Sequence, residues 1–380
     1  MKSIFLVNHF PEVSETFLVR QASFLSTTVV AKTIKTDNFK YYDFDYSEVV
    51  SLNSYVDEKN RIIQKLITRI FRRPVSSWNR RERNRFKSIL LDGKVDVVIA
   101  AFGPNGINAL QACKELGVPL IVEFLGYDAS ALMRNSWYRR KIKEVLDYAS
   151  ASVILYDGMD LPFKELGFDS DKFRVINVGV PVSSFELRSR RDDDVTNFLF
   201  VGRFVEKKGP LQTLQAFLNC AEKNSSVHLT MVGDGPLMSL AKELVEQSKH
   251  NDKVMFAGLL SQNELKPLYK SSDVFVQHSV VAVDGNSEGW PVSIAEACAS
   301  GLTVVSTKHA GIPSQVDHGR TGFLVDEHDI EGMSNYMLEL SNNKELCYQM
   351  GRNSRDYISK VGNLETQLEK LRSLVLEVTK

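Results

Sequence analysis

The feature that most constrains the fold is an alternation of short apolar runs, glycine-containing turns and helical segments. Residues 95–102 form an apolar, β-branched run, residues 103–106 contain two glycines and a proline, and a helical pattern then ends near Gly117. Residues 119–124 repeat the apolar run directly afterwards. Strands that alternate with helices in this way are typical of βαβ units, so the sequence predicts parallel sheets covered by helices.

The same order recurs in the second half of the chain, where residues 285–301 follow another apolar run. Pro291 suits the first turn of a helix, and Gly301 stands where that helix should end. A loop that enters a helix N-terminus presents free N–H groups and a partial positive charge, which favours a phosphate. Glu288 and Glu296 are expected to face one small volume beside it, where carboxylates accept hydrogen bonds from sugar hydroxyls. The stretch therefore indicates a nucleotide-sugar site.

Three motifs carry a resemblance to a known family. Glu288 and Glu296, with seven residues between them, resemble the E-x7-E signature of the retaining glycosyltransferases of family 4, which have the GT-B fold. Residues 202–209 resemble the family's Gly-Arg-x-x-x-x-Lys-Gly run, and residues 10–17 resemble an opening found in a branch that builds bacterial exopolysaccharides. The resemblance implies an α/β chain with two doubly wound, Rossmann-like domains that face each other across a cleft.

The length of 380 residues suits two domains rather than one. The polar and charged residues 181–195 are expected to link an acceptor-side domain, 1–180, to a nucleotide-sugar-binding domain, 196–362. In the fold that the resemblance implies, the C-terminal helix, 363–380, packs back on the first domain.

The resemblance also implies the reaction: a sugar moves from a nucleotide-diphosphate donor to a hydroxyl of a glycan or polyprenyl-linked acceptor, with retention and without a metal or other cofactor. Arg203 and Lys208 would stabilise the leaving diphosphate, and Glu288 would hold the donor sugar. Glu296 would hold the ribose hydroxyls. The other expected donor-binding residues are Gly202, Gly233, Asp234, Gly258, Gly289, Trp290, Pro291 and Val292. The expected acceptor-side residues are Ser14, Glu15, Thr16, Gly103, Asn105, Gly126 and Asp128.

One position departs from the family pattern. Leu125 stands where the family usually has a histidine that faces the reaction centre, in a His-Gly-x-Asp sequence. This departure keeps open a non-catalytic regulator that kept the fold. A second alternative, independent of Leu125, is another GT-B enzyme such as a sugar-nucleotide epimerase, which needs no acceptor.

Residues 61–87 are unusually basic, with ten Lys or Arg residues and one acid, Glu82. Apolar residues recur at helical spacing between 62 and 71, which gives an apolar stripe beside a basic face. This combination suits reversible binding to an anionic membrane. The alternative is a helix that packs its stripe on the sheet. Nucleic acid is not expected as a partner, because the segment has no series of aromatic residues for base stacking.

Composition places the chain among globular proteins, with 43% hydrophobic and 25% charged residues and no net charge. The four cysteines are scattered, and no apolar stretch approaches a membrane span, so we expect a cytoplasmic protein that can bind the inner face of the membrane. Two Asp-x-Asp patterns, at 43–45 and 192–194, resemble a metal-binding motif of a different glycosyltransferase fold. Neither follows a strand of the predicted nucleotide half, so no metal site is expected.

Overall fold

The computed structural model divides the chain into two compact units. Unit 1 comprises Met1–Asn177 together with Leu368–Lys380, and unit 2 comprises Val178–Gln367. The structure describes residues 2–12, 15–25, 27–41, 44–45, 49–52, 78–168, 170–190 and 194–380.

Unit 1 is built on a seven-stranded sheet in the order β3-β2-β1-β4-β5-β6-β7. All neighbouring strands are parallel, and the inner strand β1 pairs with β2 and β4, for example through Phe5 opposite Val29 and Ile99. The strands are β1 (Ser3–Phe10), β2 (Thr28–Ile34), β3 (Val49–Ser51), β4 (Val97–Ala101), β5 (Leu120–Glu123), β6 (Ala151–Ile154) and β7 (Phe173–Val175). The parallel sheet predicted from the glycine-punctuated apolar runs is confirmed.

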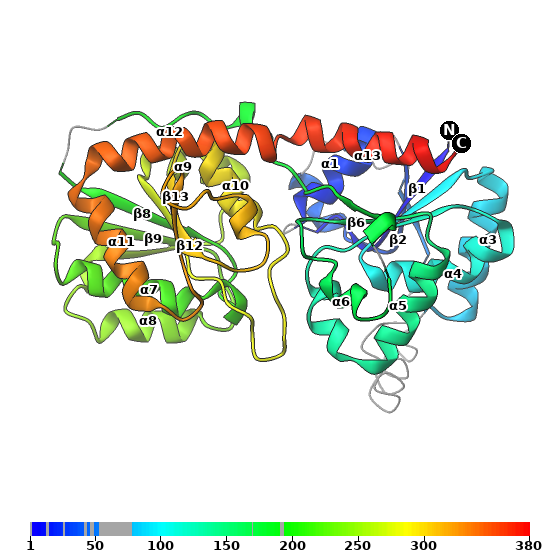
Figure 1. The fold of residues 1–380 in the computed structure, drawn as a ribbon, viewed down its shortest axis with the longest axis horizontal. Helices are drawn as coiled ribbons and strands as arrows, with labels where there is room; N and C mark the ends of the chain where they lie inside the picture. Colours follow the sequence, from blue (N-terminus) through cyan, green and yellow to red (C-terminus); the bar gives the residue numbers. More distant parts are fainter. Residues whose placement is uncertain are drawn as a thin grey trace. The chain divides into compact units, whose positions relative to one another are not determined.

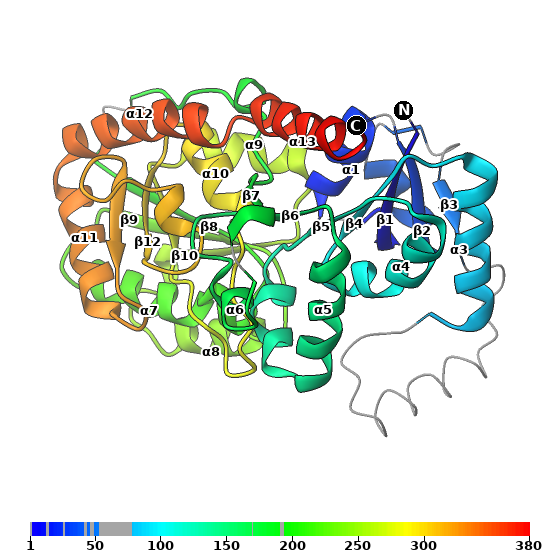
Figure 2. The ribbon, with the colours of Figure 1, turned by 45° about the vertical axis from the view of Figure 1, so that its right-hand side comes forward.

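Helices cover both faces of this sheet (Figure 2). On one face lie α1 (Thr16–Leu25) and α13 (Leu364–Val378), and α13 contributes Leu371, Leu374 and Val375 to the core of unit 1. The opposite face carries α3 (Arg80–Gly93), α4 (Gly103–Leu116) and α5 (Ser136–Tyr148), with the short α6 (Leu161–Lys164) nearby.

The predicted turn at 103–106 is wrong, because these residues form the first turn of α4. Pro104 is tolerated there because N–H groups in the first turn have no partner within the helix. The change of direction falls one residue earlier, at Phe102, whose φ is 68°. Helix α4 does end at Gly117, which has a left-handed conformation, as the sequence predicted.

Unit 2 contains a six-stranded parallel sheet in the order β10-β9-β8-β11-β12-β13. The strands are β8 (Thr196–Val201), β9 (Val227–Val232), β10 (Val254–Gly258), β11 (Val274–Gln277), β12 (Thr303–Thr307) and β13 (Gly322–Val325). Figure 1 shows α7 (Pro210–Ala221), α8 (Met238–Glu246) and α11 (Ile330–Asn342) on one face, and α9 (Gln262–Ser271), α10 (Val292–Ala299) and α12 (Lys344–Val361) on the other. Both units are thus doubly wound α/β layers.

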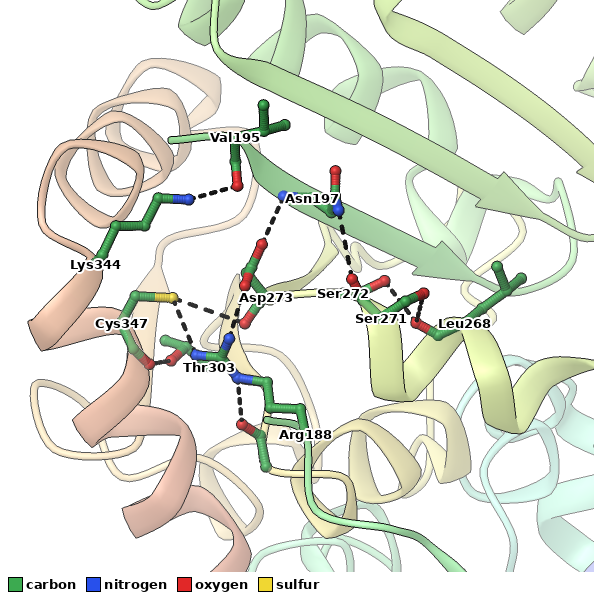
Figure 3. A network of polar contacts seen from close by, with 11 residues as sticks. Arg188, Val195, Asn197, Leu268, Ser271, Ser272, Asp273, Thr303, Lys344 and Cys347 are labelled. Atoms are coloured by element: carbon green, nitrogen blue, oxygen red, sulfur yellow. Dashed lines mark hydrogen bonds and ion pairs between the residues drawn. The ribbon is translucent and has the colours of Figure 1, made fainter. Parts of the chain in front are cut away.

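The expected linker, 181–195, is not a free connector. Arg188 is buried in unit 2, where its Nη1 donates to Asp273 Oδ1 over 2.7 Å and its Nε donates to the Gly301 carbonyl over 3.0 Å (Figure 3). The second carboxylate oxygen of Asp273 accepts the backbone N–H of Asn197 over 2.8 Å. A buried guanidinium is stable only when such partners replace its water, so this segment belongs to unit 2. The boundary therefore falls after Asn177, before the expected linker begins.

Only part of the basic segment lies in the described residues, because 61–77, with the predicted apolar stripe, lie outside them. In α3, Phe86 and Leu90 are buried, and Trp78 packs edge-on against Phe86. Residues 78–90 thus have a buried apolar face of their own, whereas the two alternatives for the stripe at 62–71 stay predictions. The basic side chains of Arg80, Arg81, Arg83 and Arg85 are exposed. Among the residues that the structure describes, no helix has both the length and the apolar character that a membrane span requires.

Candidate functional site

The candidate donor site of unit 2 lies at the carboxyl ends of β8, β11 and β12. Strand β11 pairs with both β8 and β12 in parallel, so the loops that follow these three strands emerge at the same edge of the sheet. Ligands bind at this edge in open α/β sheets. The loop after β8 carries Arg203, Lys207 and Lys208, and the loop after β11 carries Glu288.

Glu288 is the centre of an ion-pair cluster. Its Oε2 lies 3.1 Å from Lys208 Nζ, and its Oε1 lies 3.6 Å from Lys207 Nζ. Burial raises the pKa of the Glu288 carboxyl, but the two ammonium groups outweigh that effect and the net shift is downward. The Oε1 atom is buried and accepts no hydrogen bond from the described residues. A buried, ionised oxygen with spare acceptor capacity suits a ligand hydroxyl.

The structure thus brings Lys208 and Glu288 together, and it adds Lys207, which the sequence analysis did not single out. Burial lowers the pKa of Lys207, and the neighbouring charges of Lys208 and Arg203 act in the same direction against the attraction of Glu288. Arg203 itself is exposed. Its guanidinium is nevertheless close enough for its charge to lower the pKa of Lys207. The only sequence signal for Lys207 was its position next to Lys208.

Three of the expected glycines, Gly202, Gly233 and Gly258, allow the loops at the strand ends to approach one another closely. Gly233 has a φ of 131°, and a Cβ added there would lie 2.0 Å from the carbonyl oxygen of Gly202. Its N–H donates to the carbonyl of Gly258 over 2.8 Å. Asp234 is exposed, and its backbone carbonyl accepts the N–H of Phe204. These residues hold the lysine-bearing loop after β8 together with the loops after β9 and β10.

Glu296 lies in α10, buried, and is held by side chains of α9. Tyr269 donates its hydroxyl to Glu296 Oε2 over 3.0 Å, and Gln262 Nε2 donates to Oε1 over 3.2 Å. Nothing in the E-x7-E spacing indicated these two partners. Tyr269 and Gln262 therefore fix the orientation of the Glu296 carboxylate.

The residues between the two glutamates form the entry to α10. The helix begins at Val292, and Pro291 precedes it rather than standing in its first turn. Trp290, one of the expected donor-binding residues, has a buried ring, and its Nε1 donates to Ser314 Oγ over 3.2 Å. Gly289 is also buried, and its carbonyl accepts the N–H of Gly311. Gly301 follows the end of the helix with a φ of 78°, as predicted.

A separate cavity of about 250 Å³ lies in unit 1, at the carboxyl ends of β1, β4 and β5. Of the expected acceptor-side residues, Glu15, Asn105 and Asp128 line it. Its lining also includes Val7, Asn8, His9, Glu12, Leu18, Phe102, Pro104, Asn108, Tyr127 and Leu132, which the sequence analysis did not single out. Carboxylate, amide and imidazole groups beside an aromatic ring are suited to a sugar.

Asp128 has a structural task in this cavity as well. Its carboxylate accepts the backbone N–H groups of Gly103, Leu125 and Gly126 over 2.8 to 3.1 Å. Burial raises its pKa, and these hydrogen bonds reduce the rise without cancelling it. Leu125 packs against the core of unit 1 and does not line the cavity. Thr16 begins α1, whereas Ser14 lies outside the described residues.

Of the two Asp-x-Asp patterns, Asp43, Asp192 and Asp193 lie outside the described residues, and Asp45 and Asp194 are exposed.

Comparison with known proteins agrees with this geometry. Residues 185–357, within unit 2, match the family described as glycosyl transferases group 1. The putative colanic acid biosynthesis glycosyltransferase WcaL of Salmonella typhimurium is 31% identical over 250 residues, which cover 65% of this chain and 61% of WcaL. The chain therefore matches less than two thirds of that relative's length.

A longer alignment joins the chain to the UDP-Gal:alpha-D-GlcNAc-diphosphoundecaprenol alpha-1,3-galactosyltransferase of Escherichia coli. The two are 27% identical over 312 residues, which cover 76% of this chain and 77% of that enzyme. Among solved structures, Anabaena HepE in complex with UDP-glucose superposes with a TM-score of 0.78 at 16% identity, and covers 99% of this chain and 100% of HepE.

These likenesses define the class. The chain has the GT-B fold of glycosyltransferases, with two Rossmann-like parallel-sheet domains. More particularly, its sequence relatives include glycosyltransferases named for colanic acid and amylovoran biosynthesis.

Proposed function

We propose that this protein is a retaining glycosyltransferase that moves a sugar from a nucleotide-diphosphate donor to a hydroxyl of a glycan or polyprenyl-linked acceptor, in surface polysaccharide biosynthesis. The observation that carries the proposal is the buried Glu288 carboxylate, bracketed by Lys207 and Lys208 at the edge of the unit 2 sheet. A carboxylate with a spare acceptor oxygen beside two cations matches a sugar hydroxyl next to a diphosphate.

In this proposal the leaving diphosphate gains negative charge as the glycosidic bond breaks. Lys208, Lys207 and the exposed Arg203 stabilise that charge, together with the N-terminus of α10. Glu288 Oε1 accepts a hydroxyl of the donor sugar, and Glu296, oriented by Tyr269 and Gln262, accepts the ribose hydroxyls. The cations take the role that a metal has in other transferases, so turnover should survive a strong chelator.

The acceptor is proposed to bind in the unit 1 cavity, whose polar lining offers hydrogen-bond partners for hydroxyls. The leaving phosphate accepts the proton of the attacking hydroxyl on the same face of the sugar, so the anomeric configuration is retained. The names of the relatives support a carbohydrate acceptor, because one is named for colanic acid biosynthesis and another for a diphosphoundecaprenol-linked sugar.

The test is a transfer assay with UDP-, GDP- and ADP-linked hexoses and a mixture of lipid-linked and free glycan acceptors. The proposal expects one nucleotide sugar to be consumed only when an acceptor is present, with the sugar found on the acceptor. Conversion of the donor without an acceptor would favour the epimerase alternative. Binding of nucleotide sugars with no conversion would favour the regulator.

We propose that the protein acts at the cytoplasmic face of the membrane, because a lipid-linked acceptor is presented there. The exposed arginines of α3 and the basic residues Arg139 to Lys143 of α5 lie on helices that cover the same face of the unit 1 sheet (Figure 2). Such a surface is attracted to anionic lipid.

A further inference from the structure

Three adjacent strands of unit 2 deliver three polar side chains to one place. Strands β11, β12 and β13 pair in parallel, in that order. Glu288 lies in the loop after β11, His309 follows β12, and Glu327 follows β13. The carboxyl ends of parallel strands meet at one edge of a sheet, which explains why residues so distant in sequence converge there.

His309 joins the other two residues. Its side chain is only 1% exposed, and its Nδ1 lies 2.6 Å from Glu327 Oε1. Its Nε2 lies 3.1 Å from the backbone nitrogen of Glu288 and 3.0 Å from Ser287 Oγ. Both ring nitrogens therefore have partners. One of these partners is the main-chain nitrogen of Glu288, the residue at the centre of the ion-pair cluster.

The hydrogen-bond pattern assigns the tautomer of His309. A backbone N–H can only donate, so Nε2 must accept from Glu288. The ring proton then resides on Nδ1 and is donated to the Glu327 carboxylate. A proton on Nε2 would oppose the Glu288 N–H and break this contact.

Glu327 is suited to hold that proton in place. Burial raises its pKa, but the hydrogen bonds from His309 and from the Val281 N–H more than offset the rise, and the net shift is downward. The Val281 N–H donates to Glu327 Oε2 over 2.8 Å. Glu327 thus fixes the loop after β11 at two points: directly at Val281, and through His309 at Ser287 and Glu288.

We propose that His309 and Glu327 are positioning residues that fix the main chain of Glu288, so that its carboxylate faces Lys207, Lys208 and the donor sugar. The proposal rests on the proposed function for its effect on turnover, but the hydrogen bonds on which it depends exist without substrate. Small displacements of a group that contacts the reacting centre can cost on the order of 10²-fold in rate.

Four variants separate positioning from simple packing. Glu327→Gln keeps the shape. The Val281 N–H can only donate and takes the amide oxygen, so the amide N–H donates to Nδ1 and drives the ring proton to Nε2. His309→Leu removes the hydrogen bonds of both ring nitrogens. His309→Gln keeps one donor and one acceptor. Asp326→Asn is the matched control, because it makes the same charge change one residue away, at a side chain that is 78% exposed and pairs with Lys308.

The first readout needs no substrate. Nitrogen NMR of histidine-labelled protein should show His309 with Nδ1 protonated and Nε2 unprotonated in the wild type and in Asp326→Asn, and the reverse in Glu327→Gln. Hydrogen exchange should show a protected Glu288 amide in the wild type that exchanges at least tenfold faster in His309→Leu. A protonated Nε2 in the wild type, or unchanged exchange at Glu288, would overturn the positioning role.

The second readout is kinetic. Glu327→Gln and His309→Leu should lower kcat by about 10²-fold, with His309→Gln and Asp326→Asn within a few-fold of the wild type. The affinity for the nucleoside diphosphate alone should be unchanged in all four variants. Equal kcat values for Glu327→Gln and Asp326→Asn would overturn the proposal. A wild type that transfers no sugar would contradict the proposed function instead, and the exchange and NMR results would still decide the positioning role.

Discussion

Lys208 and Arg203 differ in how closely they engage the cluster at Glu288. The ammonium of Lys208 forms a 3.1 Å ion pair with the buried carboxylate, while Arg203 is exposed and acts through its charge. In the proposed mechanism both stabilise the leaving diphosphate. We expect Lys208→Ala and Arg203→Ala each to lower kcat by about 10²–10³-fold. Arg203→Ala should keep the melting temperature of the exposed Lys242→Ala control on α8, whereas Lys208→Ala should lower it, because the buried Glu288 carboxylate loses a cation. Wild-type turnover in either variant would refute its assigned role.

Glu123 in β5 supplies a prediction on stability that does not depend on function. Burial raises its pKa to about 8, and the only described hydrogen bond to its carboxyl group is the 3.2 Å contact from Gln21 Nε2. The folded state therefore keeps a proton that the unfolded chain loses near pH 4.5. Between these two values the folded state binds more protons, so stability falls as pH rises, by about 1.4 kcal/mol per pH unit.

Glu123→Gln should remove this dependence. Chemical unfolding of both proteins at several values between pH 5 and 8 should show the wild type losing stability relative to the variant as pH rises. Above pH 8 the difference should level off, because both states of the wild type are then deprotonated. Parallel curves across the whole range would show that Glu123 is ionised in the folded protein.

At the scale of elements, α3 presents one face to the core and another to solvent. Phe86 and Leu90 are buried, whereas Arg80, Arg81 and Arg85 are exposed. In the proposed function this basic face binds anionic lipid through charge alone. The wild type should co-sediment with vesicles of anionic phospholipid at low salt and be released at high salt, because charges separated by more than about 8 Å are screened at physiological ionic strength.

The triple variant Arg80→Gln, Arg81→Gln, Arg85→Gln should weaken this binding and leave turnover on a water-soluble acceptor unchanged. The matched control replaces three exposed lysines of unit 2, Lys223, Lys242 and Lys266, by Gln. Equal losses in both variants would indicate a general charge effect, and no loss in either would remove α3 from the proposed membrane surface.

For the whole molecule, the sequence predicted the features that local patterns determine, namely the parallel sheets and the ends of two helices. Apolar runs ending at glycines predicted the parallel sheets, and left-handed Gly117 and Gly301 do terminate their helices. Motif resemblance placed Lys208 and Glu288 in one predicted site, but their ion pair was not predicted, because 80 residues separate the two.

What escaped prediction depends on contacts between distant segments. Arg188 looked like a surface residue of a linker, because its partners Asp273 and Gly301 lie 85 and 113 residues away. Likewise His309 and Glu327 belong to no motif and acquire their arrangement only from the order of β11, β12 and β13. The contact of Trp290 Nε1 with Ser314 Oγ also joins residues 24 positions apart, which no local pattern predicts.

The central claim is that unit 2 binds a nucleotide-diphosphate sugar and that the chain transfers the sugar with retention, without a metal. The most direct measurement is proton NMR of the transfer product, with the reaction run in excess chelator. The account predicts a glycoside with the same anomeric configuration as the donor, formed at a rate unaffected by the chelator. A product of inverted configuration, or transfer that stops with chelator and returns with added magnesium or manganese, would contradict it.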